Sequence, residues 1–209
     1  IAQLKGDTAT IETPYGRAPL TFADLIEKVK PSVGSISVVA GGKPSEAAVA
    51  PFDARTLRAA LGGFATGVTL VTCRGTQREP VGLTVNSFNA LSLDPPLVLW
   101  SLRLASPSLA AFDAAEHFAI NVLSEGQVDL SRRFASALPG KFDDGSWHEG
   151  TAGLPLLSGS AATFECERVS RQDGGDHRLY IGRVLRVQWQ PVPPLVFHRG
   201  HYHLLGEVL

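Results

Sequence analysis

Cysteine is scarce in this chain of 209 residues, and its scarcity excludes several kinds of site. Cys73 and Cys166 are the only two, and they lie far apart in the sequence. No Cys-x-x-Cys pair or Cys/His cluster has the spacing of a zinc site, so we expect no bound metal. Two isolated cysteines also give no disulfide framework, which favours a reduced, cytoplasmic location.

An excess of one charge and long apolar runs are lacking as well. The formal net charge is −1, the pI is about 6.7, and there is no basic run or tail. A surface that binds nucleic acid needs clustered Lys and Arg, so we expect no nucleic-acid partner. No apolar run reaches the roughly 18 residues of a membrane span, and the first residues lack a charged-then-apolar signal pattern. We therefore expect no membrane partner either.

Two familiar catalytic patterns are absent, and the remaining pattern is that of a β protein. There is no Gly-x-Gly-x-x-Gly for a dinucleotide held in the Rossmann manner, and no serine nucleophile with partner His and Asp at suitable distances. About seven short strand-like segments occur with only two or three helices and no alternation of strand and helix. This pattern favours a mainly β, antiparallel barrel over a doubly wound sheet.

The stretch from Gly82 to Ser101 predicts two strands joined by a turn at Asp94-Pro95-Pro96, because proline cannot lie inside a β-ladder. The second strand is apolar throughout, as expected for a strand buried on both faces. The first has a neutral polar face, and such donors and acceptors suit a flat, uncharged ring better than a metal or a nucleic acid. A solvated strand face is the alternative. The polar side chains of the stretch are Thr84, Asn86, Ser87, Asn89 and Ser92.

Three helix starts can be predicted from their capping residues. Asp53 is expected to cap a helix that runs to about Leu61, and Ser124 with Gln127 forms a capping box. Ser106 followed by proline is a strong N-cap signal, and the free amides of a helix start can hold a phosphate. Arg103 lies close by in the sequence. An ordinary capped helix without a ligand is the alternative.

Residues 1–50 differ from the rest of the chain and are expected to form an N-terminal extension. Residues 21–30 have the spacing of a short amphipathic helix, residues 33–39 read as a strand, and residues 41–51 have the composition of a linker. The segment 17–38 weakly resembles the entry segment of periplasmic trypsin-like serine proteases, but it carries none of their catalytic residues. We expect a second unit, residues 51–209, to hold the barrel.

Five blocks between about residues 52 and 206 resemble one family and follow its order. The family is the flavin reductase-like family with the FMN-binding split barrel, which includes the reductase components of two-component flavin monooxygenases. The resemblance implies a six-stranded antiparallel Greek-key barrel that forms a homodimer, with the flavin near the dimer interface. The blocks are Phe64-Ala-Thr-Gly-Val-Thr-Leu-Val-Thr, Gly82 to Leu99, Phe118-Ala-Ile-Asn-Val-Leu, Gly175-Asp-His-Arg-Leu-Tyr-Ile-Gly-Arg-Val and His201-Tyr-His-Leu.

The resemblance also implies a set of binding residues. Those expected at the isoalloxazine ring are Thr84, Val85, Asn86, Ser87 and Phe88. Those expected along the ribityl chain towards the phosphate are Ser101, Leu102, Ala105 and Ser106. Arg133 and Phe134 are also expected to approach the flavin, although arginine departs from the residue type of the family there. His177 would orient and help neutralise the nicotinamide nucleotide, and Tyr202 would close the same pocket. The alternatives are a turn shaped by Asp176 and an exposed strand residue at position 177.

The activity implied is hydride transfer from NADH or NADPH to FMN, with FAD as a possible flavin, and supply of reduced flavin to a partner monooxygenase. The cofactors carry this reactivity, so no catalytic side chain is required and none is predicted. Two other hypotheses stay open: a reductase of a ferric chelate or a corrinoid on the same barrel, and a non-catalytic flavin-binding protein. The residues do not distinguish NADH from NADPH or FMN from FAD, and they do not identify the oxygenase.

Overall fold

The computed structural model describes residues 11–13, 16–18, 52–144 and 146–207. In the first two ranges, β1 (Ile11–Thr13) and β2 (Gly16–Ala18) pair in antiparallel register. The helix, strand and linker expected between residues 21 and 51 lie outside the described residues, as does most of the segment that resembles serine proteases. In the described part of the chain, no helix has the length and hydropathy of a membrane span.

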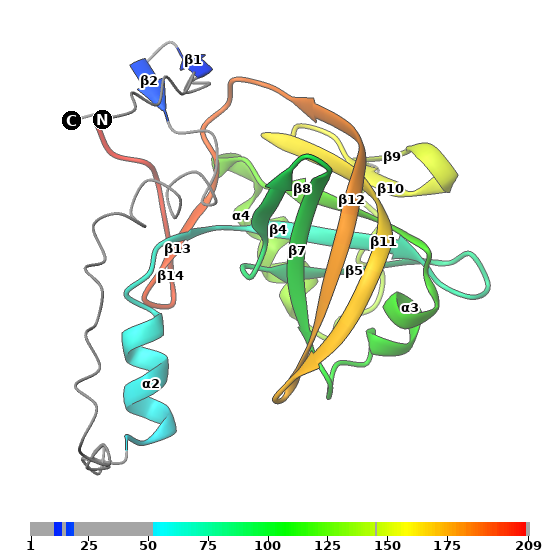
Figure 1. The fold of residues 1–209 in the computed structure, drawn as a ribbon, viewed down its shortest axis with the longest axis horizontal. Helices are drawn as coiled ribbons and strands as arrows, with labels where there is room; N and C mark the ends of the chain where they lie inside the picture. The colour runs from blue at the N-terminus through cyan, green and yellow to red at the C-terminus, as the bar shows by residue number, and fades with distance from the viewer. Residues whose placement is uncertain (1–10, 14–15, 19–51, 145, 208–209) are drawn as a thin grey trace, which may run out of the picture.

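One antiparallel sheet forms the barrel (Figure 1). The fold is mainly β with few short helices, as predicted. The sheet has seven strands where six were expected, because residues 89–93 pair as a hairpin with the strand that follows them. In spatial order the strands are β5 (Pro80–Val85), β4 (Thr69–Arg74), β8 (His117–Val122), β11 (Ala162–Gly174), β12 (His177–Trp189), β7 (Pro96–Arg103) and β6 (Asn89–Leu93).

The remaining elements sit around this barrel. A three-stranded sheet has the order β14 (His201–His203), β13 (Val196–His198) and β3 (Thr66–Gly67), and β10 (Pro155–Leu157) pairs with β9 (Trp147–Glu149). The helices are α2 (Ala54–Leu61), α3 (Leu109–Ala114) and α4 (Val128–Ala135), with 3-10 turns at Glu125–Gln127 and Thr151–Gly153.

Two of the three predicted helix starts are confirmed. Asp53 Oδ1 accepts a hydrogen bond from Thr56 N at 2.6 Å, and Ser124 N donates to Gln127 Oε1 at 3.0 Å in the capping box. The prediction that Ser106 caps a helix is wrong, because α3 begins only at Leu109. Strand β7 runs on to Arg103, so the Ser-Pro pair falls in the turn that follows the strand.

Aromatic side chains fill the core between β7, β12 and α3. The Trp100 ring stacks on Tyr180 at 4.6 Å between centroids, with Phe112 at 4.9 Å and Phe118 at 5.8 Å edge-on to it. All four side chains are buried. Offset and edge-to-face arrangements of this kind are favourable beyond the area that they bury, so this core rigidly supports the strands on either side.

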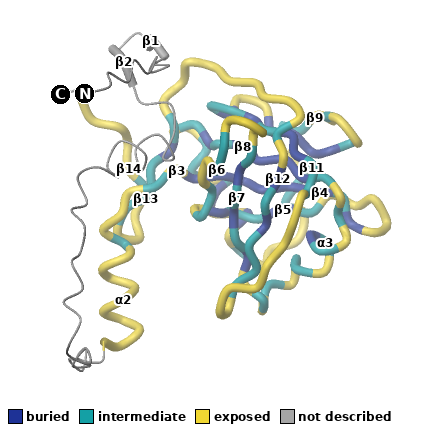
Figure 2. The backbone as a smooth tube through the Cα atoms, viewed as in Figure 1, coloured by how far each residue is buried: buried dark blue, intermediate teal, exposed yellow. Residues whose placement is uncertain are grey.

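The outer helix α2 contrasts with this core, since none of its residues is buried (Figure 2). It lies beside the β13–β14 hairpin, away from the barrel (Figure 1), and Arg199 N donates to Gly62 O at 2.9 Å. Its apolar side chains and those just after it are solvent-exposed in the single chain: Leu57 is 43% exposed, Leu61 65% and Phe64 73%.

Candidate functional site

A cavity of about 480 Å³ opens where several elements of the barrel end. Its walls come from the end of β5 and the link after it, the end of β7 with the following loop, and the start of β12. Cavities of roughly 300–1,000 Å³ with few charged groups are typical of small-molecule sites. The lining residues are Leu83, Thr84, Val85, Asn86, Ser87, Ser101, Leu102, Arg103, Ala105, Ser106, Pro107 and His177.

The link between β5 and β6 closes the barrel at this cavity. These strands are the two edges of the main sheet, and residues 86–88 connect them. Ser87 Oγ accepts from Ser101 N at 2.9 Å and donates to Ser101 O at 3.1 Å, so two hydrogen bonds attach the link to β7. The hydroxyl of Thr84 donates to Ser131 O in α4 at 2.6 Å. Both hydroxyls are engaged within the protein, and Val85 O accepts from Thr69 Oγ1 at 2.9 Å, so the backbone of 86–87 and the Asn86 amide are the groups left for a ligand.

The turn between β11 and β12 brings His177 to the opposite wall. Gly175 has φ +64°, a conformation that glycine adopts without steric cost, and this allows the tight turn at 174–177. His177 Nδ1 lies 2.7 Å from Asp176 Oδ1, which orients the ring and leaves Nε2 for a ligand. The hydrogen bond from His177 and then its charge lower the pKa of Asp176.

The turn is also attached to the loop that lines the cavity. Leu104 N donates to Asp176 O at 2.9 Å, and His177 pairs with Arg103 in the β12–β7 register. Leu83, Arg103 and Pro107 line the cavity but were not among the predicted site residues, and Arg103 is the charged one of the three. A guanidinium is a strong ligand for phosphate, so Arg103 supplies the charge that the mispredicted helix start does not.

Four predicted residues do not line this cavity. Phe88 packs against Phe164, with 5.5 Å between ring centroids. Phe134 is 1% exposed and lies in the second hydrophobic cluster, and its neighbour Arg133 points the other way to pair with Asp144 at 3.3 Å. Successive helix residues lie about 100° apart, so a buried Phe134 turns Arg133 outward.

Tyr202 is the fourth of these residues. Its hydroxyl lies 2.9 Å from Ser131 Oγ, and its ring packs on Phe197 at 5.5 Å. It therefore joins β14 to α4. The other nine predicted residues do come together at the cavity, but their contacts with a cofactor stay a prediction.

A second, wider cavity of about 1,090 Å³ adjoins the first and shares Asn86 and Ser87 with it. It lies between α2, the β13–β14 turn and the link, and Arg55, Arg58 and Arg199 are among its lining residues. The link therefore borders two spaces, one inside the barrel mouth and one beneath α2.

Thiol and metal chemistry find little support in the described residues. Burial raises the pKa of the Cys73 and Cys166 thiols to about 12, so neither is a thiolate near neutral pH. Among the residues that the structure describes, no three His, Cys, Asp or Glu side chains are grouped to hold a metal ion. Trp147, the first residue of β9, packs on Phe142 with 4.7 Å between ring centroids.

The first cavity fits a flavin by the chemistry of its lining. The backbone of 86–87 and the Asn86 amide can meet the heteroatoms of a flat neutral ring, and apolar Leu83, Val85 and Leu102 can lie against its carbon edge. Arg103 and Ser106 also line the cavity, and a guanidinium and a hydroxyl are groups that can hold a phosphate. His177 lines the same cavity, beside Arg103, its partner in the β12–β7 register.

Comparison with known proteins gives consistent matches. The family described as "Flavin reductase like domain" matches residues 61–206. "FMN reductase (NADH) SmoA" of Agrobacterium fabrum is 47% identical over 151 residues, covering 72% of this chain and 85% of its own. The "Flavin-dependent monooxygenase, reductase subunit HsaB" of Mycobacterium tuberculosis is 42% identical over 156 residues, covering 73% and 83%.

The solved structures agree with the sequence matches. The NADH:FAD oxidoreductase SgcE6 of Streptomyces globisporus, in complex with NAD and FAD fragments, aligns with a TM-score of 0.70 at 36% identity. The alignment covers 74% of this chain and 93% of that one. From the family match and these relatives, the chain belongs to the flavin reductase-like family.

Proposed function

We propose that this chain transfers hydride from NADH or NADPH to FMN or FAD and supplies the reduced flavin to a separate monooxygenase. The prediction of an NAD(P)H-dependent flavin reductase is confirmed by relatives named as an FMN reductase (NADH) and an NADH-dependent FAD reductase. Several relatives are named as reductase subunits of flavin-dependent monooxygenases, which supports the proposed partner. The cavity that brings the neutral polar link opposite His177 is the observation that carries the proposal.

The cavity divides into three parts in this proposal. The backbone of residues 86–87 and the Asn86 amide would contact the polar edge of the isoalloxazine, because they line the cavity while the hydroxyls of Thr84 and Ser87 and the Val85 carbonyl have partners within the protein. Arg103 and Ser106 would hold the flavin phosphate. His177, fixed by Asp176, would contact the nicotinamide nucleotide from the other wall. Phe88, Arg133, Phe134 and Tyr202 act as packing or surface residues in this assignment.

The protein would work by positioning the flavin and the nicotinamide nucleotide and by excluding other arrangements of the two rings. The flavin, when bound, supplies an electrophilic N5 that accepts the hydride. The two hydrogen bonds between Ser87 and Ser101 would hold the backbone that contacts the flavin ring in a fixed position. Fixed placement of two reactants accounts for much of a rate enhancement. His177 would bind and orient the donor and transfer no proton, so no acid–base pair is needed.

The apolar face of α2 supports a homodimer with the flavin site near its interface. Leu57, Leu61 and Phe64 are exposed in the single chain, and contiguous exposed apolar surface marks an interaction site. The cavity beneath α2 shares Asn86 and Ser87 with the flavin cavity. A second copy seated on α2 would therefore adjoin the ring-binding link. Residues 1–50 would form an extension outside this catalytic unit.

Steady-state oxidation of NADH and of NADPH with FMN, FAD and riboflavin in turn tests the function. Anaerobic bleaching of the flavin by the donor would support direct hydride transfer. Parallel assays with a ferric chelate and a corrinoid as acceptor distinguish the alternative reductases. A protein that binds flavin but does not accelerate its reduction by either donor would contradict the proposal and favour a flavin-binding role.

A further inference from the structure

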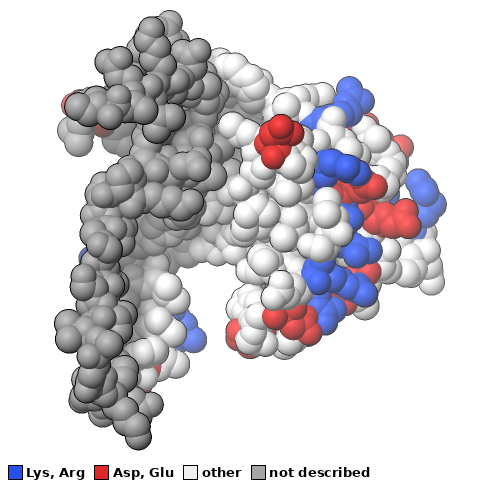
Figure 3. Space-filling model, viewed as in Figure 1, with Lys and Arg blue, Asp and Glu red and all other residues white. Residues whose placement is uncertain are grey.

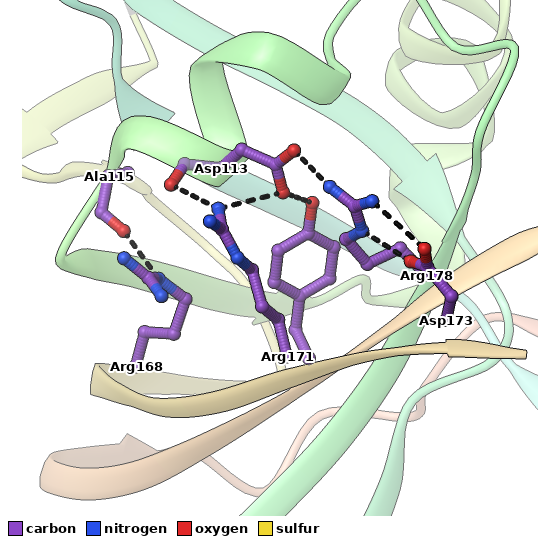
Figure 4. Close-up of polar contacts among 7 residues, drawn as sticks. Asp113, Ala115, Arg168, Arg171, Asp173 and Arg178 are labelled. Atoms are coloured by element: carbon purple, nitrogen blue, oxygen red, sulfur yellow. Dashed lines mark hydrogen bonds and ion pairs between the residues drawn. The ribbon is translucent and has the colours of Figure 1, made fainter.

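Asp113, at the end of α3, is the centre of a charged cluster on the β11–β12 hairpin (Figure 4). Its Oδ1 accepts from Tyr180 Oη at 2.8 Å and lies 3.3 Å from Arg171 Nη1, and its Oδ2 accepts from Arg178 Nη1. Arg171 Nη1 also donates to the Asp113 backbone carbonyl at 2.8 Å. One carboxylate on a short helix thus contacts side chains from both strands of the hairpin.

Arg178 connects Asp113 to the turn between β11 and β12. Its Nε donates to Asp173 Oδ1 at 2.7 Å and its Nη2 to Asp173 Oδ2 at 3.2 Å, a paired contact across the hairpin. Bidentate contacts of this kind fix orientation as well as distance. Asp173 pairs with Arg178 in the ladder, and the next pair towards the turn is Gly174 with His177. The cluster therefore clamps the hairpin one ladder position before His177.

Tyr180 connects the same carboxylate to the core behind the cavity. Its ring stacks on Trp100, which precedes Ser101 of the cavity wall. Burial and the hydrogen bond to Asp113 raise the pKa of the Tyr180 hydroxyl, so it stays a donor to the carboxylate. On the other side, the loop before α3 carries Ala105, Ser106 and Pro107 of the cavity lining. Asp113 thus ties the hairpin to the segment that follows the 105–107 part of the cavity lining.

We propose that Asp113 is a positioning residue for flavin reduction, which acts by holding His177 where the nicotinamide nucleotide binds. The inference rests on the donor-binding role proposed for His177. Asp113 itself lines none of the cavity described above and has no contact with the reacting atoms. Removing its charge would leave Arg171 and Arg178 without their shared partner and would let the turn at 174–177 move relative to the loop at 104–107.

The test is a double-mutant cycle with the full chain, combining Asp113→Asn with His177→Ala. Asp113→Asn should raise the KM for NADH by about threefold to tenfold, while kcat and the Kd of FMN each change by less than about twofold. In the His177→Ala background the same substitution should change KM by less than about twofold, since the group it positions is already gone. Arg171→Gln, at a half-exposed side chain, is a second variant in case Asp113→Asn does not fold, and should give a smaller rise in the same direction.

Glu167→Gln is the matched control, because it removes an ion pair on the same two strands, Glu167 with Arg183, away from the turn. It should leave the KM for NADH unchanged. A lower Tm for Asp113→Asn with an unchanged KM, beside a raised KM in His177→Ala, would overturn the positioning role alone. An equal rise in KM with and without His177 would also overturn it. An unchanged KM in His177→Ala itself would instead remove the donor-binding role of His177 on which the inference depends.

Discussion

The two walls that flank the link at residues 86–88, the hairpin wall and the α2 wall, are stabilised in opposite ways. The hairpin wall, β11–β12 with its turn, is held by charged side chains whose partners lie in the same chain. Figure 3 shows basic and acidic side chains interspersed over this side of the barrel. The α2 wall, Ala54–Leu61 with Phe64, has no buried side chain in the helix and exposes its apolar face.

The difference indicates which parts of the site one chain can build alone. Ion pairs in the hairpin wall are satisfied without another molecule, so donor binding at His177 should be a property of each chain. Apolar surface is stabilised only when it is removed from water, so α2 should reach its final environment in the dimer. The predictions below test each wall in turn, beginning with the one expected to change most.

The α2 wall should be the more sensitive to a single charge. Leu61→Glu should weaken dimerisation by about 100-fold or more, because a carboxylate would have to be buried without a partner in the interface. Sedimentation velocity across a micromolar concentration series measures the change. Flavin reduction per chain should fall with the dimer fraction, because in the proposed dimer the second copy would adjoin the link at Asn86 and Ser87.

Leu138→Glu is the control for this variant, since Leu138 is 63% exposed but lies beyond α4. It should leave the dimer intact. A wild-type chain that is monomeric at micromolar concentration and still reduces flavin would show that the α2 face has another occupant.

In the hairpin wall, substitution of His177 in the turn should weaken binding of the hydride donor. His177→Ala should lower kcat/KM for NADH by about tenfold to a hundredfold, since a lost hydrogen bond to a charged partner is worth about 1.5–3 kcal/mol. The loss should appear mainly in KM and leave flavin affinity nearly unchanged. His201→Ala, at an exposed histidine in the other short hairpin, should have no such effect. Equal losses of flavin and nucleotide affinity would contradict the division between the walls and leave the 174–177 turn with a structural role.

The loop between the two walls should give a smaller, flavin-specific effect. Arg103→Ala should weaken FMN by about fivefold to tenfold and riboflavin by less than about twofold, because only FMN has a phosphate to lose. Ser106→Ala should show the same preference at about threefold, through a neutral hydrogen bond. Fluorescence titration with both flavins measures the ratio. If riboflavin and FMN weakened alike, the phosphate would lie elsewhere.

Sequence patterns predicted the parts of this structure that depend on local chemistry. The turn at Asp176 and the neutral polar side chains of Thr84, Asn86 and Ser87 follow from turn residues and alternation, and the structure has both. The positions of Phe134 and Tyr202 could not be predicted from local patterns, because each depends on which face of α4 packs against the barrel. The prediction of a helix start at Ser106-Pro107 was wrong because nothing in the local sequence indicates that β7 continues to Arg103. The contacts of Asp113 could not be predicted from local sequence, because its partners lie about 60 positions away along the chain.

The smallest effect should come from outside both walls. The family match begins at residue 61, and the described residues that line the first cavity all lie at or beyond Leu83, so we predict that residues 1–45 are dispensable for flavin reduction. Deleting them while keeping Asp53 as the cap of α2 should leave kcat within about threefold of the full chain, because surface segments away from a site usually change little. Circular dichroism and sedimentation velocity would establish that the barrel and the dimer persist. Loss of activity in a folded dimer would show that the extension completes the site. Loss of the dimer would show that the extension, together with α2, forms the second wall.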